Sequence, residues 1–366
     1  MEEQREEFCR LASHPEANVS EICRRFGISR KTGYKWLGRL DLRDQSRRPR
    51  SSPARTSAEI EACVIELRRQ HPAWGGRKIA HVLRRDQCIE LAPSTVTSVL
   101  RRAGLISPQA SEAATAWQRF EHPRPNSLWQ MDFKGHFAVG TRRCHPLTVL
   151  DDHSRYNVVL RAMAGEDGAS VRAVLTHAFE RYGLPERINA DNGPPWGSGG
   201  RGITALAAWL IRLGIHVSHS RPFHPQTNGK DERFHKTLVA EVLSGRTFHD
   251  FESLQYRFND WRSIYNNVRP HESLDMQTPA DRYAPSPRSM PGSLPNFEYS
   301  PGDLIRRVQA LGIVKFKGRR LRTSAALHGE IVALRADGKT DGAYDVFYCH
   351  QRVDRFDLNQ IQSESS

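Results

Sequence analysis

The sequence has 366 residues, 26% of them charged and 38% hydrophobic. This composition is typical of a folded protein with hydrophobic cores, and the length predicts two to four domains. A formal net charge of +13 favours a polyanionic partner, nucleic acid ahead of an acidic membrane surface, although a charge that only aids solubility is the alternative.

The cysteines and the apolar stretches indicate an intracellular protein. No C-x-x-C pair occurs, so we expect reduced thiols rather than a zinc knuckle or a disulfide framework. The start, MEEQREEF, is acidic and has no apolar region of the kind found in signal peptides. The longest apolar stretch, near 203–211, is too short to span a bilayer. We therefore predict cytoplasmic localisation and no membrane partner.

Residues 16–40 predict a helix-turn-helix. Apolar residues at helical spacing lead to Gly27, which is placed to end the first helix in a left-handed conformation. Ser29 is placed to N-cap a second, basic helix. Such a pair is a DNA-binding arrangement whose second helix reads the major groove, although any small helical hairpin shows this pattern. The predicted DNA contacts are Arg30, Lys31, Thr32 and Lys35.

Residues 41–56 read as an extended linker, because arginine alternates there with serine and proline. Such a basic segment lies along phosphates or in a minor groove, or it is only a solvated tether. Its candidate DNA contacts are Arg47, Arg48 and Arg50.

Residues 57–105 repeat the helical theme and predict a second helix-turn-helix module. A helix face in the first part is interrupted by HPAWGG, and APSTVTSVLRRAGL follows as a second recognition helix. Ser94 is placed as its cap and Gly104 just after its end. We expect the DNA contacts Thr95, Thr97, Arg101 and Arg102. Residues 106–124 are predicted to be another linker.

Residues 125–270 carry an α/β pattern, within a catalytic core predicted to span 125–285. Residues 127–137 alternate as a strand, with Trp129 on one face and Asp132 on the other. Two further strands complete a meander, and two more alternate with helices. We predict a mixed five-stranded sheet with flanking helices, followed by two long helices.

Residues 271–300 are rich in proline and predict a linker. Short apolar runs separated by turn signals then occupy 300–358, where we expect a small basic β-barrel that contacts DNA or protein. Residues 1–45 and 57–105 are thus the predicted DNA-binding domains of a multidomain chain.

Three carboxylates come from separate predicted elements: Asp132 in the first strand, Asp191 at the end of the fourth, and Glu232 near the start of a helix. Strand ends are where α/β proteins place functional groups. Three converging carboxylates suit hard divalent cations, and two such ions clamp the attacking and leaving oxygens of a phosphoryl displacement. Spacing alone is a weak signal in a chain with 41 acidic residues.

The strings around these acids are more specific: WQMDFKGHF, NADNGPPWGSG, RPFHPQTNGKDERFHKTL and YNNVRPHESLDMQTPADRY. They resemble the DDE transposases of bacterial insertion sequences, in the branch closest to retroviral integrases. The likeness covers residues 125–285 closely and the whole chain loosely. It implies a ribonuclease H-like core and a metal-binding catalytic triad of Asp132, Asp191 and Glu232 that holds two Mg²⁺ ions, with Mn²⁺ as a substitute.

Two features depart from the family pattern. The interval from Asp191 to Glu232 is longer than usual, and the Gly-rich stretch 196–202 accounts for the excess as a loop. Asp231 adjoins Glu232, about 100° around the helix, so periodicity does not separate the two acids. The G-x-x-E-R-F-H match favours Glu232.

Other polar residues near the triad have open roles. Asp151 and Asp152 are rival acids for which we expect a structural role, for example a pair with Arg155. Asn228 and Gly229 precede the helix that carries Glu232, and the N-terminus of a helix attracts phosphate. The basic side chains of this helix either contact the DNA backbone or form surface salt bridges. The histidines near it either contact the scissile phosphate or have an ordinary hydrogen-bonding role. These residues are Lys230, Arg233, Lys236, His224 and His235.

The resemblance implies a transposase that binds the terminal inverted repeats of its element. It would hydrolyse the 3′ ends and join the 3′-OH to target DNA, acting as a homo-oligomer, at least a dimer on DNA, in the bacterial nucleoid. Two alternatives stay open: a non-catalytic DNA-binding regulator derived from a transposase, and a structure-selective nuclease of the same fold.

Overall fold

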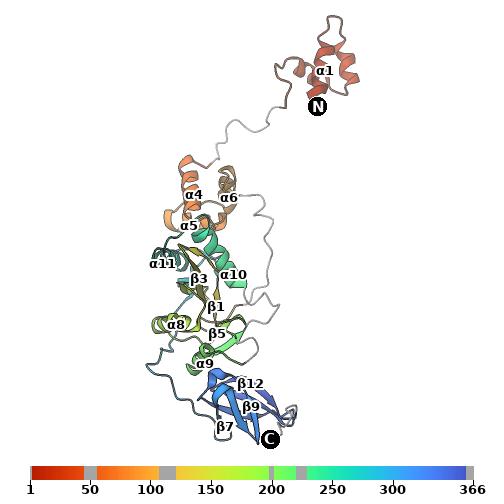
Figure 1. Cartoon of the computed structure of the whole chain (residues 1–366). Coiled ribbons are helices and arrows are strands. Elements are labelled where there is room, and N and C mark those ends of the chain that lie inside the picture. The colour runs from red at the N-terminus through yellow and green to blue at the C-terminus, as the bar shows by residue number, and fades with distance from the viewer. Residues whose placement is uncertain (1, 45–55, 107–120, 198–201, 220–228, 360–366) are drawn as a thin grey trace. The chain divides into compact units, whose positions relative to one another are not determined.

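The computed structural model describes residues 2–44, 56–106, 121–197, 202–219 and 229–359 (Figure 1). The chain divides into two compact units, Met1–Ser57 and Ala58–Ser366. The segment that holds Arg47, Arg48 and Arg50, and also His224, lies outside the described residues.

The first unit is a bundle of three short helices, α1 (Glu2–Ala12), α2 (Val19–Arg25) and α3 (Arg30–Leu37). Phe8 is fully buried at its centre, with edge-on contacts to Phe26 and Trp36 at ring-centroid distances of 5.5 and 5.4 Å.

The turn between α2 and α3 confirms the sequence prediction. Gly27 has a φ of +64°, and Ser29 accepts a hydrogen bond from the Thr32 amide as the N-cap. Gly33 sets the crossing of α2 and α3, because a Cβ there would lie 2.6 Å from the Cys23 sulfur. The pair is a helix-turn-helix.

The second unit opens with three more helices, α4 (Ala58–Gln70), α5 (Gly76–Gln87) and α6 (Pro93–Arg102). Gly76 allows α5 to approach α6 closely, because a Cβ there would meet the Thr97 hydroxyl at 2.3 Å. Ala92, not Ser94, is the N-cap of α6, since Pro93 occupies the first turn and starts the helix earlier than expected.

The central element is a six-stranded mixed sheet. Its strands are β1 (Trp129–Phe133), β2 (Phe137–Val139), β3 (Arg142–Asp151), β4 (Asn157–Met163), β5 (Arg187–Ala190) and β6 (His216–His219). The meander β1, β3 and β4 is antiparallel, and β5 and β6 run parallel to β1. All five predicted strands are present. The sixth, β2, exists because Gly135, with a φ of +83°, turns the chain within the expected first strand.

Helices cover both faces of this sheet. One apolar cluster joins β1 to α8 (Gly168–Tyr182) and α9 (Ala205–Arg212). A second cluster joins β3 and β4 to α10 (Gly229–Leu238), the π-helix η2 (Val239–Leu243) and α11 (Phe251–Asn267). The Asp132 face of β1 therefore lies under α10.

The two edges of the sheet are closed by side chains. Gln255 of α11 accepts from the Ala162 amide at 2.8 Å and donates to the Leu160 carbonyl at 3.0 Å. Gln351 pairs in the same two-sided way with Val217 of β6, at 2.8 and 2.9 Å. These amides satisfy backbone groups that would otherwise bind another strand.

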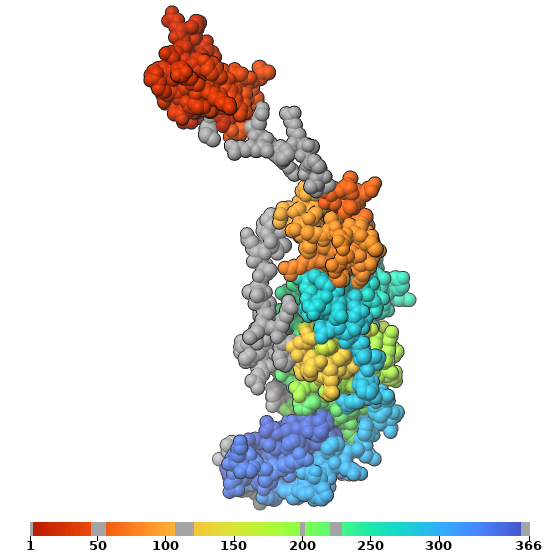
Figure 2. Space-filling view, turned by 180° about the vertical axis from the view of Figure 1, so that it is seen from behind, coloured from red at the N-terminus to blue at the C-terminus, as the bar shows by residue number. Residues whose placement is uncertain are grey.

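The helical module α4–α6 packs against the region of α11, as Figure 2 shows from behind. Arg77 pairs with Glu272 at 3.1 Å, and Ile264 of α11 joins the apolar cluster of the module. The segment expected as a linker at 271–300 instead contains the short helices η3 (Glu272–Leu274) and α12 (Pro279–Arg282).

The C-terminal region contains two sheets. A four-stranded sheet has the order β12 (Gln351–Asp357), β11 (Ala343–Tyr348), β10 (Ile331–Ala336), β7 (Leu304–Arg307). A separate hairpin joins β8 (Ile313–Phe316) to β9 (Arg319–Arg322), and two short 3-10 turns, η4 (Ala310–Gly312) and η5 (Ala325–Leu327), connect strands. Within the described residues no strand pairing joins these two sheets, so the predicted closed barrel is not confirmed.

Candidate functional site

Asp132 and Asp191 lie at the same edge of the sheet. Asp132 belongs to β1, and Asp191 directly follows β5, which pairs with β1 in parallel. The carboxyl ends of parallel neighbours meet at one edge, which brings together two acids that are far apart in the sequence. The Asp191 carboxylate accepts a hydrogen bond from the Gly193 amide at 3.1 Å.

The pKa values of both carboxylates are raised. Burial, with a smaller contribution from the Asp191 charge, raises the pKa of Asp132 to about 6. Burial also raises the pKa of Asp191, while the Gly193 amide opposes that shift. Two partly buried carboxylates with raised pKa values are a suitable donor set for a hard divalent cation, because the cation would offset the unfavourable burial of their negative charges.

Glu232 does not join this pair in the structure. It lies in the first turn of α10 with an exposed side chain, whereas Asp231 is only 3% exposed. One carboxylate oxygen of Asp231 is buried without a hydrogen-bond partner. Burial raises the pKa of Asp231 well above its usual value, and the charges of Asp132 and Asp152 add to the effect.

The structure thus turns Asp231, not Glu232, toward β1. Among the residues that the structure describes, no group of three or more His, Cys, Asp or Glu side chains is arranged to hold a metal ion. The carboxylate oxygens of Asp132 and Asp191 are of the chemical kind that such an ion prefers as ligands.

His235 connects α10 to β3 one turn further on. The Thr148 hydroxyl donates to the Asp132 carbonyl at 3.0 Å, so its oxygen accepts from His235 Nε2 at 2.9 Å. This fixes the proton of a neutral ring on Nε2. Burial lowers the pKa of His235 to about 4, so the ring is neutral at pH 7. Its Nδ1 lies 3.9 Å from an Asp132 carboxylate oxygen.

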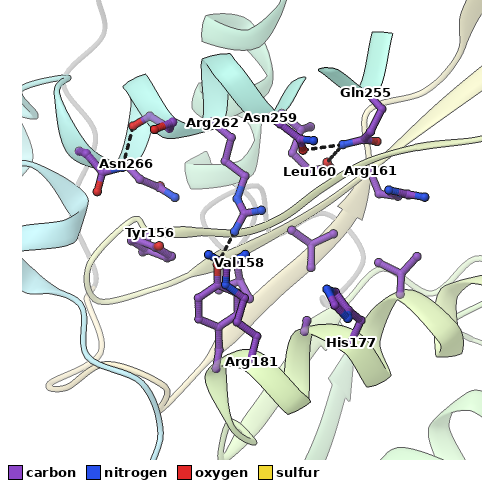
Figure 3. Close-up of a pocket in the computed structure, with 16 residues that line it drawn as sticks. Tyr156, Val158, Leu160, Arg161, His177, Arg181, Gln255, Asn259, Arg262 and Asn266 are labelled. Carbon is purple, nitrogen blue, oxygen red and sulfur yellow. Dashed lines mark hydrogen bonds between the residues drawn. The ribbon is translucent and has the colours of Figure 1, made fainter. Parts of the chain in front are cut away.

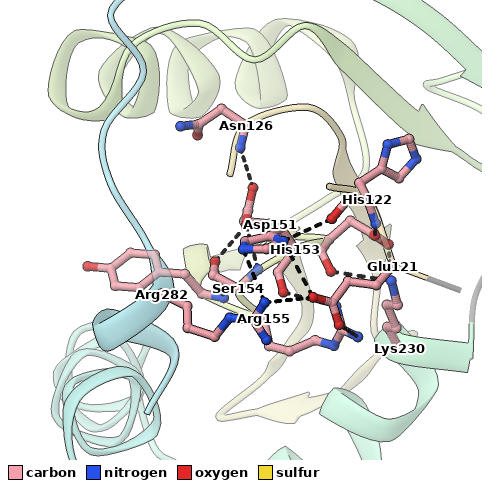
Figure 4. Close-up of polar contacts among 11 residues, drawn as sticks. Glu121, His122, Asn126, Asp151, His153, Ser154, Arg155, Lys230 and Arg282 are labelled. Carbon is pink, nitrogen blue, oxygen red and sulfur yellow. Dashed lines mark hydrogen bonds and ion pairs between the residues drawn. The ribbon is translucent and has the colours of Figure 1, made fainter. Parts of the chain in front are cut away.

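Asp151 holds the turn that follows β3. It accepts hydrogen bonds from the Ser154 amide and hydroxyl and from the Asn126 amide (Figure 4). Arg155 pairs with Glu121 at 3.5 Å, so the pair with an aspartate that we expected is wrong. Glu121 also accepts from Arg282 at 3.0 Å. The structural role expected for Asp151 is confirmed.

Asp152 is only 2% exposed at its side chain, and three donors surround its carboxylate. They are the His122 amide at 2.9 Å, the Gln130 side chain at 2.8 Å and the Lys230 ammonium group at 2.5 Å. Lys230, which we expected to contact DNA phosphates, is therefore directed inward. Sequence reasoning missed this pair because its members are 78 residues apart and no local pattern links them.

The remaining predicted DNA contacts differ in exposure. Arg30, Lys31 and Lys35 of α3 are exposed, and Thr32 is half-buried with its hydroxyl bonded to Ser29. On α10, Arg233 and Lys236 are both exposed.

On α6, Arg101 and Arg102 are both exposed, and Arg102 also pairs with Glu61 at 2.6 Å. Thr97 packs against α5 and donates to the Pro93 carbonyl, and Thr95 is half-buried.

A cavity of roughly 500 Å³ lies between β4, α8 and α11 (Figure 3). None of these elements carries a predicted catalytic acid. Several of its polar lining residues are already engaged; Arg262 donates to Tyr182 and to the Asn157 carbonyl, and Gln255 closes the β4 edge. The cavity is therefore separate from the acidic site.

The chain matches three kinds of known domain. Residues 122–225 and 213–279 match the Integrase core domain, residues 32–100 match a Homeodomain-like domain, and residues 303–364 match the IS481 family transposase, C-terminal domain. The sheet order, the acidic edge and these matches define an integrase core domain.

Similar proteins agree with this class. The "Insertion element IS476 uncharacterized 39.2 kDa protein" of Xanthomonas euvesicatoria is 26% identical over 75% of this chain and 75% of its own length. The "Insertion element IS407 uncharacterized 31.7 kDa protein" of Burkholderia multivorans is 24% identical over 74% of this chain and 92% of its own length. The chain thus combines an integrase core domain with a region that matches the C-terminal domain of a transposase family, and it is similar to proteins of bacterial insertion elements.

Solved structures include a chain of the simian T-cell lymphotropic virus intasome, 15% identical with a TM-score of 0.40, covering 81% of this chain and 96% of that one. The HTLV-2 integrase catalytic core domain in complex with magnesium is 17% identical with a TM-score of 0.33, and the match covers 44% of this chain and 97% of that one.

None of the helices described here is long and apolar enough to cross a membrane.

Proposed function

We propose that this transposase binds the terminal inverted repeats of its element, hydrolyses the 3′ ends and joins them to target DNA with Mg²⁺ or Mn²⁺. The observation that carries the proposal is the pair of partly buried carboxylates, Asp132 and Asp191, at one edge of an integrase core. Glu232 is proposed as the third ligand, because it matches the family motif and lies in the first turn of α10, the helix that packs near β1.

The proposed chemistry has two balanced steps. Water attacks the phosphorus at the transposon end, the bond from phosphorus to the 3′ oxygen breaks, and a 3′-OH is left. That hydroxyl then attacks a target phosphodiester, so one P–O bond forms as another breaks and no energy cofactor is needed. Two divalent cations, when bound, would stabilise negative charge on the reacting oxygens. Asp132 and Asp191 would hold the cations, and neutral His235 keeps α10 against β3 beside Asp132.

Recognition of the ends is proposed for both helix-turn-helix modules. Arg30, Lys31 and Lys35 are exposed on α3, and Arg101 is exposed on α6, so these side chains are free to reach a groove or a phosphate. The net charge of +13 supports a nucleic-acid partner. Because two ends have to be joined, we propose at least a dimer on DNA, in the bacterial cytoplasm and associated with the nucleoid.

The test is cleavage and strand transfer of labelled transposon-end DNA with Mg²⁺, Mn²⁺ or a chelator. We expect metal-dependent nicking at the 3′ ends that is lost in Asp132→Asn and Asp191→Asn while end binding persists. Sequence-specific binding without cutting in either metal would instead favour a regulator, for which the exposed Glu232 is the supporting observation. Cutting of branched DNA without end sequence would favour a structure-selective nuclease.

A further inference from the structure

We propose that the buried ion pair between Lys230 and Asp152 positions the first turn of α10, which carries Asp231 and Glu232, against β1, which carries Asp132. Lys230 is then a positioning residue and not a phosphate contact. The inference rests on the proposed function for its catalytic meaning, whereas the anchoring of α10 is observable without catalysis.

The pair stands at a junction of three chain segments. Asp152 directly follows β3, and its carboxylate accepts from Gln130 of β1 and from the His122 amide, which precedes β1. Lys230 adds the third segment, the start of α10, with a further hydrogen bond to the Asp152 carbonyl at 3.3 Å. Each of these groups is thereby fixed relative to the others.

The junction lies next to the predicted catalytic residues in both elements. Gln130 is two residues before Asp132 and on the same face of β1, because strand side chains alternate. Lys230 is two residues before Glu232, within one helical turn. A shift of the ion pair therefore moves the helix start relative to the strand that carries Asp132.

The charges explain why a cation is required at this place. Asp152 and Asp231 are both buried, and the negative charges of Asp132 and Asp152 both act on Asp231. The Lys230 ammonium group is the cation that opposes them at Asp231. Without it, Asp152 would be a buried carboxylate with no counter-charge among several acids, which is strongly unfavourable. The side chain of Lys230 is 19% exposed, so little of it is available to a DNA phosphate.

The two roles predict different behaviour for Lys230→Met. A positioning role raises the metal concentration for half-maximal cleavage by roughly 10–100-fold, the usual effect of groups that orient ligands, with metal-free end binding unchanged. A phosphate contact weakens end binding and lowers its salt slope by about one, with the metal requirement unchanged. Lys230→Arg, which keeps the charge, restores the metal requirement in the first case.

A double variant distinguishes the two roles, because they predict different outcomes for the metal requirement. Adding Asp152→Asn to Lys230→Met removes the uncompensated buried charge, so the double variant should recover part of the loss. A phosphate contact gives no such recovery. Lys236→Met is the matched control, because Lys236 is an exposed lysine of the same helix. It should weaken DNA binding without changing the metal requirement.

The deciding measurement is hydrogen exchange of the full-length chain in chelator, which needs no activity. We expect Lys230→Met to lower protection of the α10 amides at least 10-fold while α11 (Phe251–Asn267) is unchanged, and Lys230→Arg to restore it. Unchanged α10 protection would overturn the proposal, as would a loss spread evenly over α11. If α10 loosens but the wild-type chain never cleaves end DNA, the proposed function fails and the anchoring of α10 stands.

Discussion

Replacing Asp132 by asparagine should stabilise the metal-free protein at neutral pH while it abolishes cleavage. Asparagine keeps the shape of the side chain and removes the charge that burial and Asp191 disfavour. A carboxylate that binds metal is selected for function at the expense of the apo fold.

The magnitude follows from the pKa. A rise from 3.8 to about 6 is roughly two units, or about 3 kcal/mol at 1.36 kcal/mol per unit. The side chain is 30% exposed, so solvent screening reduces this to about 1–2 kcal/mol. For a unit of this size we expect a melting temperature about 1–3 °C higher.

The raised pKa of Asp132 also predicts how the stability difference between wild type and variant changes with pH. Between pH 4 and 6 the folded state binds more protons at Asp132 than the unfolded state does, so wild-type stability falls as pH rises through this window. The advantage of Asp132→Asn should therefore be absent below pH 4, grow up to pH 6 and stay constant above it. Mg²⁺ should raise the melting temperature of the wild type and not that of the variant.

The assay is thermal unfolding in chelator from pH 3.5 to 8, with Asp260→Asn as a control for loss of an exposed carboxylate. A variant that is less stable than wild type at pH 7.5, or an advantage that does not change with pH, would refute the reasoning. The cleavage assay with the same proteins separates stability from chemistry.

Three further predictions concern α10 and the helical module. Glu232→Gln should abolish cleavage without a change in stability. Asp231→Asn should instead stabilise the metal-free protein by about 1–3 kcal/mol, since it removes a buried carboxylate with an unpaired oxygen. Thermal unfolding and cleavage assays check both variants, and the reverse pattern would make Asp231 the metal ligand. Burial lowers the pKa of Lys78 to about 7, so Lys78→Met should raise the melting temperature most below pH 7 and not at all above pH 10.5, as unfolding scans across this range would show. Arg101→Ala should weaken end binding and lower its salt slope by about one, whereas Arg102→Ala should act mainly on stability through Glu61, which salt titrations of binding would reveal.

The sequence by itself determined the elements and the family. Alternation in 127–137, the Gly27 and Ser29 signals and the strings around the three acids are local patterns, and local backbone preferences and motif matches need no tertiary information. They predicted the mixed sheet, the first helix-turn-helix and the transposase class, all of which the structure and the known relatives confirm.

The tertiary structure decided which side chains face one another. Adjacent Asp231 and Glu232 differ by about 100° around a helix, so only the packing of α10 on β1 selects the one that is buried. The sequence predicted Lys230 and Arg102 as DNA contacts, because a sequence shows the charge of a side chain but not its ion-pair partner. Asp152 and Glu61, 78 and 41 residues away, pair with them only because the fold brings distant segments together and a buried charge requires a counter-charge.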